Sequence, residues 1–412
     1  MKFRRNSGQE QDDKVIRVKR PLGGETRENQ KNRRKKAHIK TFWVLFLLVL
    51  IVSLSVGVYV YRKMRRYRGY KVIRSTELQY EATAEYIEFG GNLLKYTPEG
   101  VSYINANGDM VWTTGIDLKV PIAKVKGDYA VIGDKGGNTV CVFSTAGEVG
   151  KVTMPYEIRD IDVCKTGAFT VILESDEVNY INMYSSTGEK IYEMQTSIDR
   201  SGYPIDMTIS DDGQKLFTSY FRLDGVNIVN QLTAYNFGEV GQNTNADRMV
   251  GGFTFDDEMI PKVEFLTNSC VAAFTDQEIK LYTMKEKPTE KATIAYDGEV
   301  IGVFYSSSYV GIVQKNPDAN VGGYLMKVYD TSGKELFQYP FSIEYERIYA
   351  AKNEIIVTGG NQCLIVTKSG RTKFSYAFSS MIKSMVPAAK RNQYIVTFED
   401  RTETIKLTTE DK

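Results

Sequence analysis

The chain of 412 residues carries 53 Lys and Arg against 51 Asp and Glu, so a quarter of it is charged while the net charge is only +2. Its one histidine, His38, lies near the N-terminus. The rest of the chain therefore has no imidazole for a Ser-His-Asp site, a Cys-His site or a histidine-ligated metal, which excludes most familiar hydrolases.

Residues 1–40 form a basic tail with 14 Lys and Arg and 5 Asp and Glu. Such a segment buries too little apolar surface to offset its chain entropy, so we expect it to be disordered and attracted to anionic lipid headgroups. A nucleic-acid-binding arm is the alternative interpretation. We favour lipid, and expect no nucleic acid, because basic clusters are common beside membrane spans.

Thr41 to Tyr61 is a run of 21 residues without a charge. As a helix it would extend roughly 31 Å, which matches the hydrocarbon thickness of a bilayer. A cleaved signal peptide has a shorter apolar core, and Ser55-Val56-Gly57 is the only passable cleavage site. The pattern predicts a retained signal-anchor and hence a single-pass membrane protein.

Residues 62–79 form a second basic segment, a juxtamembrane stalk. Residues 21–40 and 62–81 hold seven Lys and Arg each, so flanking charge does not set the orientation. Because a short basic tail is costly to translocate and long domains cross largely regardless of charge, we expect residues 1–40 in the cytoplasm and the large domain outside. A cytoplasmic domain acting as an interaction platform is the alternative.

Residues 80–410 consist of short alternating strands separated by turn signals. A strand, a tight turn and a second strand recur, and each of these units centres on a glycine, as hairpin turns with positive φ favour. In three units a pair of adjacent glycines precedes the turn glycine, and the second glycine of the pair lies ten residues before it. The turn glycines are Gly108, Gly147, Gly188, Gly333 and Gly370.

A period near 40 residues with about four strands per unit predicts an all-β fold, a β-propeller of about eight four-stranded blades, with seven as the alternative. A pair of β-sandwiches would not explain why the ten-residue spacing between the glycine pair and the turn glycine recurs in three units. The last blade is one strand short, and Lys71 to Glu81 could supply that strand and close the ring. We expect the inner strands near Tyr86, Ile122, Ile161, Ile205, Val263, Ile301, Ile348 and Ser384.

Turns such as YDTSG at Tyr329 to Gly333 resemble those of the pyrroloquinoline-quinone-like and WD40-like propellers. More narrowly, residues 41–410 resemble an uncharacterised family of Gram-positive bacterial proteins with one N-terminal span and an external propeller. The resemblance implies the fold and a place at the cell membrane, and it implies no particular reaction.

We expect no cofactor and no metal site. Quinone-dependent dehydrogenases of this fold stack the cofactor on tryptophan beside an adjacent cysteine pair. The domain has one tryptophan, Trp112, which we interpret as a packed blade residue, and no adjacent cysteines, so we expect no quinone. Gly133, Gly136 and Gly137 suit a turn better than a phosphate cradle, since no helix follows them. Asp211 and Asp212 lack the spacing of a calcium loop. The four cysteines have no C-x-x-C spacing and fall on different blades, so we expect buried thiols; they are Cys141, Cys164, Cys270 and Cys363.

A partner should bind the face that carries the loops between second and third strands and the connections between blades. We expect this face to include the longest insertions, namely Gly238 to Glu258, Gln314 to Gly323 and Ser197 to Pro204. Aromatic residues there could anchor a peptide or glycan, or could fill space between irregular blades. The candidate partner-binding residues are Tyr203, Phe253, Phe255, Asp256 and Asp257.

These observations favour a non-catalytic binding or scaffolding module at the cell envelope, whose partners are membrane lipids and an unknown envelope protein or glycan. A glycan hydrolase or lyase that uses acidic residues is the alternative, and it would need two convergent carboxylates in the channel of the ring.

Overall fold

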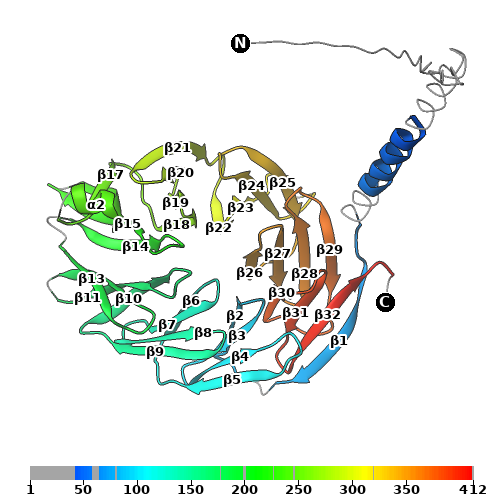
Figure 1. Cartoon of the computed structure of the whole chain (residues 1–412), viewed down its shortest axis with the longest axis horizontal. Coiled ribbons are helices and arrows are strands. Elements are labelled where there is room, and N and C mark those ends of the chain that lie inside the picture. Colours follow the sequence, from blue (N-terminus) through cyan, green and yellow to red (C-terminus); the bar gives the residue numbers. More distant parts are fainter. Residues whose placement is uncertain are drawn as a thin grey trace, which may run out of the picture. The chain divides into compact units, whose positions relative to one another are not determined.

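The computed structural model describes residues 42–57, 65–78, 81–176, 178–197, 201–225, 227–244, 246–318 and 320–410. Residues 42–57 form a helix, which is drawn in blue in Figure 1. No helix among the described residues has the length and apolar character needed to span a membrane. The predicted tail, and residues 41 and 58–61 of the predicted span, lie outside the described residues.

Residues from Arg66 onward form a compact unit separate from the helix, and this unit is a ring of eight four-stranded antiparallel sheets, the blades (Figure 1). We number the blades I to VIII and give their strands from the inside outward. Blade I contains β2 (Glu85–Phe89), β3 (Asn92–Tyr96), β4 (Gly100–Ile104) and β5 (Met110–Gly115); blade II contains β6 (Pro121–Lys126), β7 (Tyr129–Asp134), β8 (Thr139–Ser144) and β9 (Gly147–Thr153). Blade III contains β10 (Glu157–Val163), β11 (Phe169–Glu174), β12 (Asn179–Tyr184) and β13 (Lys190–Thr196); blade IV contains β14 (Tyr203–Ile209), β15 (Lys215–Asp224), β16 (Asn227–Asn236) and β17 (Met249–Phe255).

The second half of the ring continues the same order. Blade V contains β18 (Lys262–Thr267), β19 (Cys270–Phe274), β20 (Glu278–Met284) and β21 (Pro288–Ala295); blade VI contains β22 (Val300–Ser306), β23 (Tyr309–Lys315), β24 (Tyr324–Asp330) and β25 (Glu335–Phe341). Blade VII contains β26 (Arg347–Ala350), β27 (Glu354–Gly359), β28 (Gln362–Thr367) and β29 (Thr372–Ala377); blade VIII contains β30 (Ser384–Pro387), β31 (Gln393–Thr397), β32 (Arg401–Thr408) and β1 (Gly69–Glu77). The predicted propeller of eight blades is confirmed, and each predicted inner strand coincides with an inner strand of the ring.

Strand β1 closes the ring, as the sequence predicted. It pairs antiparallel with β32 from Gly69 opposite Thr408 to Glu77 opposite Arg401, with one bulge. The first strand in the chain thus becomes the outermost strand of the last blade (Figure 1). This pairing covers an edge of β32 that would otherwise be free to pair with another chain.

The core lies between the blades. Eight clusters of buried apolar side chains each join two neighbouring blades, and together they cover every interface of the ring. Trp112 illustrates the packing: its ring stacks between Tyr103 and Phe143, and its Nε1 donates to the carbonyl oxygen of Thr145 on blade II at 3.1 Å. The prediction that Trp112 packs between strands is confirmed, and the four cysteines are buried free thiols as expected.

The ring has two faces, which we name by their connections. The turn face carries the turns between first and second strands and between third and fourth strands. The loop face carries the connections between second and third strands and between blades. Hydrogen bonds join the turns of neighbouring blades on the turn face, for example Lys165 N to Asp211 O, Ser308 Oγ to Lys352 O and Asn236 Nδ2 to Glu286 O.

One expectation about these faces is wrong. The segment Gly238 to Glu258 is not a single loop on the loop face, because most of it continues blade IV. It begins in the turn between β16 and β17, on the turn face, and forms the short helix α2 (Glu239–Thr244) there. It then forms β17, so only residues 256–258 reach the loop face. Residues 316–318 and 320–323, by contrast, do lie on the loop face, between β23 and β24.

Candidate functional site

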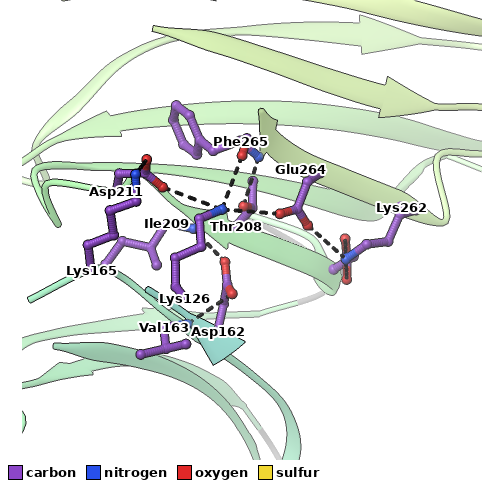
Figure 2. A network of polar contacts seen from close by, with 11 residues as sticks. Lys126, Asp162, Val163, Lys165, Thr208, Ile209, Asp211, Lys262, Glu264 and Phe265 are labelled. Carbon is purple, nitrogen blue, oxygen red and sulfur yellow. Dashed lines mark hydrogen bonds and ion pairs between the residues drawn. The ribbon is translucent and has the colours of Figure 1, made fainter. Parts of the chain in front are cut away.

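Charged side chains from four blades meet around the ring axis, at the turn-face end of the inner strands. Lys126, the last residue of β6, extends from blade II toward blades IV and V (Figure 2). Its Nζ lies 3.6 Å from Glu264 Oε1 on β18, 3.4 Å from Asp211 Oδ1 after β14, and donates to Phe265 O at 3.4 Å. Lys165 on blade III lies 2.6 Å from the other oxygen of Asp211. Lys126 therefore connects blades that are not neighbours.

A second lysine extends this cluster toward the loop face. Lys262 Nζ lies 3.1 Å from Asp206 Oδ2 and 3.9 Å from Glu264 Oε2. Asp206 also accepts the backbone N–H of Val263 at 2.7 Å. On the neighbouring strand β10, the carboxylate of Asp162 accepts the N–H of Ile209 on blade IV at 2.9 Å (Figure 2). We call Lys126, Asp162, Asp206, Asp211, Lys262 and Glu264 the axial network.

Burial shifts the protonation of these groups. It raises the pKa of Asp206 to about 7, although Lys262 and the Val263 N–H oppose the shift. Burial, and then the charge of Asp162, raise the pKa of Glu264. Burial lowers the pKa of the Lys126 ammonium, but the charges of Glu264, Asp162 and Asp211 more than offset this, so the pKa lies above its ordinary value. The lysines therefore stay charged at neutral pH, while Asp206 can exchange a proton there.

A cavity of about 760 Å³ lies beside the axial network. It is lined by the inner strands of blades I, II, VI and VII, which face one another across the ring, so it lies on the ring axis. Its polar groups include Glu88, Lys126, Tyr305 and Tyr349. The Tyr349 hydroxyl donates to Glu88 at 3.3 Å, and Arg347 Nη2 on the same strand pairs with Glu85. Among the groups that line the cavity, Glu88, Lys126 and Tyr349 thus already have partners within the ring.

The carboxylates of the axial network do converge, as the alternative of a glycan-cleaving enzyme requires. However, Asp206 and Glu264 are paired with lysines, and Asp162 accepts two backbone N–H groups, one of them from its own neighbour Val163. These contacts bind the blades together and suit a structural role. This network was not among the sites predicted from the sequence. Its signal is charged residues at alternate positions of the predicted inner strands, as in AKVK ending at Lys126 and RDID ending at Asp162.

The predicted partner-binding aromatics pack within the ring. Phe253 lies 4.7 Å from the Tyr282 ring on blade V, and the Phe255 ring lies under Lys280 Nζ at 5.1 Å. Both contact the core between blades IV and V. Tyr203, at the loop-face end of β14, donates its hydroxyl to Glu174 at 3.0 Å. These contacts match the space-filling alternative, and they hold the three rings at one end of blade IV without gathering them into an exposed patch.

Asp256 and Asp257 follow directly, and both are exposed on the loop face. They belong to a wider pattern, because the described loop-face segments contain 15 acidic residues and only three basic ones, Lys119, Lys135 and Lys383. Six of the acidic residues pair with a lysine or arginine. The acidic residues are Glu81, Glu99, Asp117, Asp176, Asp256, Asp257, Glu258, Asp276, Asp297, Glu299, Asp318, Glu344, Glu346, Glu399 and Asp400.

The turn face has the opposite charge. Its described segments from Arg66 onward contain 12 basic and nine acidic residues. The ring is therefore polarised along its axis, with an acidic loop face and a mildly basic turn face. Within the described residues, no group of three or more His, Cys, Asp or Glu side chains is arranged to hold a metal ion.

Similar solved structures support the fold. BamB from Moraxella catarrhalis has 10% sequence identity and a TM-score of 0.50, with 82% of this chain and 99% of that chain covered. Sqt1 from Chaetomium thermophilum has 11% identity and a TM-score of 0.52, with 82% and 100% covered. No curated protein matches the sequence. One family does match, over residues 63–407, and the chain belongs to it: the family of unknown function DUF5711.

Proposed function

We propose that this protein is a membrane-tethered binding module, whose ring holds a positively charged partner at the cell envelope on its acidic loop face. The proposal rests on the charge of the loop face, whose described segments contain 15 acidic residues and only three basic ones. Electrostatic complementarity of this kind speeds encounter with oppositely charged partners and suppresses encounter with others. A basic segment of an envelope protein has the matching chemistry.

The membrane tether in this proposal is the uncharged run from Thr41 to Tyr61, of which residues 42–57 are helical. The extracytoplasmic position of the ring follows from the cost of translocating the basic tail, and a Gram-positive source follows from the family resemblance. Both stay predictions. Binding is favoured over glycan cleavage because the converging carboxylates of the axial network already accept bonds from lysines and backbone N–H groups.

The test compares two sets of matched substitutions in the full-length protein, purified from cells after crosslinking. The first set, Asp117→Asn, Asp256→Asn and Asp257→Asn, removes three exposed loop-face charges. The control set, Glu189→Gln, Glu239→Gln and Glu286→Gln, removes three exposed turn-face charges. We expect a specific partner that is recovered with the wild type and the control set and reduced several-fold with the first set. Equal recovery with both sets would refute the loop face as the binding surface.

A further inference from the structure

The chain joins the ring on the turn face, at blade VIII. The N–H of Tyr67 donates to Lys373 O on blade VII at 2.8 Å, and the N–H of Arg68 donates to Thr408 O at 3.0 Å. The side chain of Asn392, in the turn between β30 and β31, donates to the Tyr67 hydroxyl at 2.8 Å. These three bonds fix the first residues of the ring against the turns of blades VII and VIII, before β1 begins at Gly69.

The basic residues of the turn face gather around this point. The described turn segments of blades VI to VIII contain eight basic residues and one acidic residue, Glu410. The turn segments of blades I to V contain four basic and eight acidic residues. The eight basic residues, which we call the basic sector, are Arg66, Arg68, Lys334, Lys352, Lys368, Arg371, Lys390 and Arg391.

Most of the basic sector is open to solvent: six of its side chains are exposed, and those of Lys368 and Arg371 are half-buried. Among the described residues, no ion pair involves Lys334, Lys352, Lys390 or Arg391, whereas many lysines on the strands are paired with carboxylates. The fold therefore pairs several strand lysines with carboxylates and leaves the charges of these four turn-face residues available. A surface of this kind suits an extended anionic partner.

Chain length limits how far the basic sector can lie from the proposed span. Tyr67 lies six positions after Tyr61, and a fully extended chain advances at most about 3.6 Å per position. The attachment point on the turn face therefore lies within roughly 22 Å of the end of the span. Tilting of the ring toward blades VI to VIII would bring the basic sector within the Debye length, about 8 Å at physiological salt, of the headgroups.

We propose that the basic sector rests on anionic lipid headgroups of the membrane that holds residues 41–61, so that the loop face points away from the bilayer. This inference rests on the membrane tether of the proposed function. Lysine and arginine side chains near an anionic leaflet are attracted to it and lose that attraction as salt rises. The charge polarity of the ring supports the same orientation, because the leaflet that attracts the basic sector repels the acidic loop face.

The test uses the full-length protein in lipid nanodiscs, with one fluorescent probe per molecule. Because the four native thiols are buried, a probe attaches selectively to an engineered cysteine, either Asn353→Cys on the turn face or Asp257→Cys on the loop face. A nitroxide on the lipid headgroups then quenches whichever probe lies near the bilayer. We expect several-fold stronger quenching at position 353 than at position 257 in discs that contain an anionic lipid. We also expect high salt to abolish the difference.

Paired variants check the assignment to the basic sector. Lys390→Gln with Arg391→Gln should reduce quenching at position 353, and Lys285→Gln with Lys287→Gln, on the turn face of blade V, should leave it unchanged. Equal quenching at both positions, or quenching independent of anionic lipid, would overturn the proposal. So would a probe at position 353 that responds to soluble polyphosphate and not to anionic discs. Failure of the protein to enter nanodiscs would instead refute the membrane tether, and the partner-recovery experiment tests the loop face separately.

Discussion

Lys126 should contribute more to the stability of the ring than its place at the end of one inner strand suggests. The change Lys126→Met keeps the aliphatic stem and removes the ammonium, which lies 3.4 Å from Asp211 and 3.6 Å from Glu264. Asp211 keeps Lys165 as a partner at 2.6 Å. Glu264 keeps Lys262 at 3.9 Å and a hydrogen bond with Tyr305, so the substitution mainly removes the nearest ammonium from Glu264.

The magnitude follows from these distances. With an effective dielectric constant of about 20, each of the two contacts attracts by about 5 kcal/mol before desolvation is subtracted. Breaking a buried ion pair on one side costs about 3–5 kcal/mol. Because the Lys126 side chain is 23% exposed and water relieves part of this penalty, we expect a loss of about 2–3 kcal/mol.

The assay is urea unfolding of the full-length protein in detergent, in a Trp43→Phe background, followed by the fluorescence of Trp112, the one tryptophan of the ring. The midpoint should fall while the slope stays unchanged. The matched control is Lys165→Met, which removes a lysine that contacts the same Asp211 but is 58% exposed, and it should cost less than about 1 kcal/mol. A Lys126→Met protein as stable as this control would refute the view that Lys126 holds nonadjacent blades together.

Three further predictions concern protonation, turn geometry and ring closure. Because folding raises the pKa of Asp206 from 3.8 to about 7, the free energy of unfolding of the wild type should fall as pH rises through that window. The free energy of unfolding should fall with pH more steeply in the wild type than in Asp206→Asn, by up to about 1.4 kcal/mol per pH unit. Parallel pH profiles of the two proteins would contradict this. Gly188→Ala should destabilise by over about 2 kcal/mol, since φ is +90° and an added Cβ would lie 2.3 Å from Val152. Gly136→Ala, with φ +75° and open space, should cost about 1 kcal/mol in the same urea assay, and equal costs would show that the contact with Val152 is unimportant. Deleting residues 1–78 removes β1 and exposes the edge of β32, so this protein should self-associate in sedimentation experiments, whereas deletion of residues 1–64 should leave a monodisperse ring.

The blade pattern was readable because it depends on local chemistry. Turn glycines recur where the backbone needs positive φ, as at Gly188 and Gly333, and alternating apolar residues mark the strands between them. Blade IV was harder, because β15 and β16 are ten residues long and the turn before β17 contains a helix. The expectation that Gly238 to Glu258 forms one loop failed at this irregularity.

The axial network was not predictable in the same way. Lys126 and Glu264 are 138 positions apart, and only the radius and tilt of the ring bring their side chains together. The charge difference between the two faces was partly predictable. Once the loop face and the turn face are assigned, the strand order places each charged loop residue on one face or the other. Individual aromatics such as Phe253 could not be placed from sequence, because an exposed ring and a ring packed between blades occupy the same kind of position on an outer strand.

The proposed position of the ring, outside the cell membrane with its acidic loop face available, can be tested by one labelling experiment. A membrane-impermeant maleimide is added to intact cells that produce the full-length Asp257→Cys protein, in which the native thiols are buried. We expect labelling of Asp257→Cys before lysis and none of the wild type. Labelling that appears only after the membrane is broken would place the loop face in the cytoplasm and refute the proposed orientation.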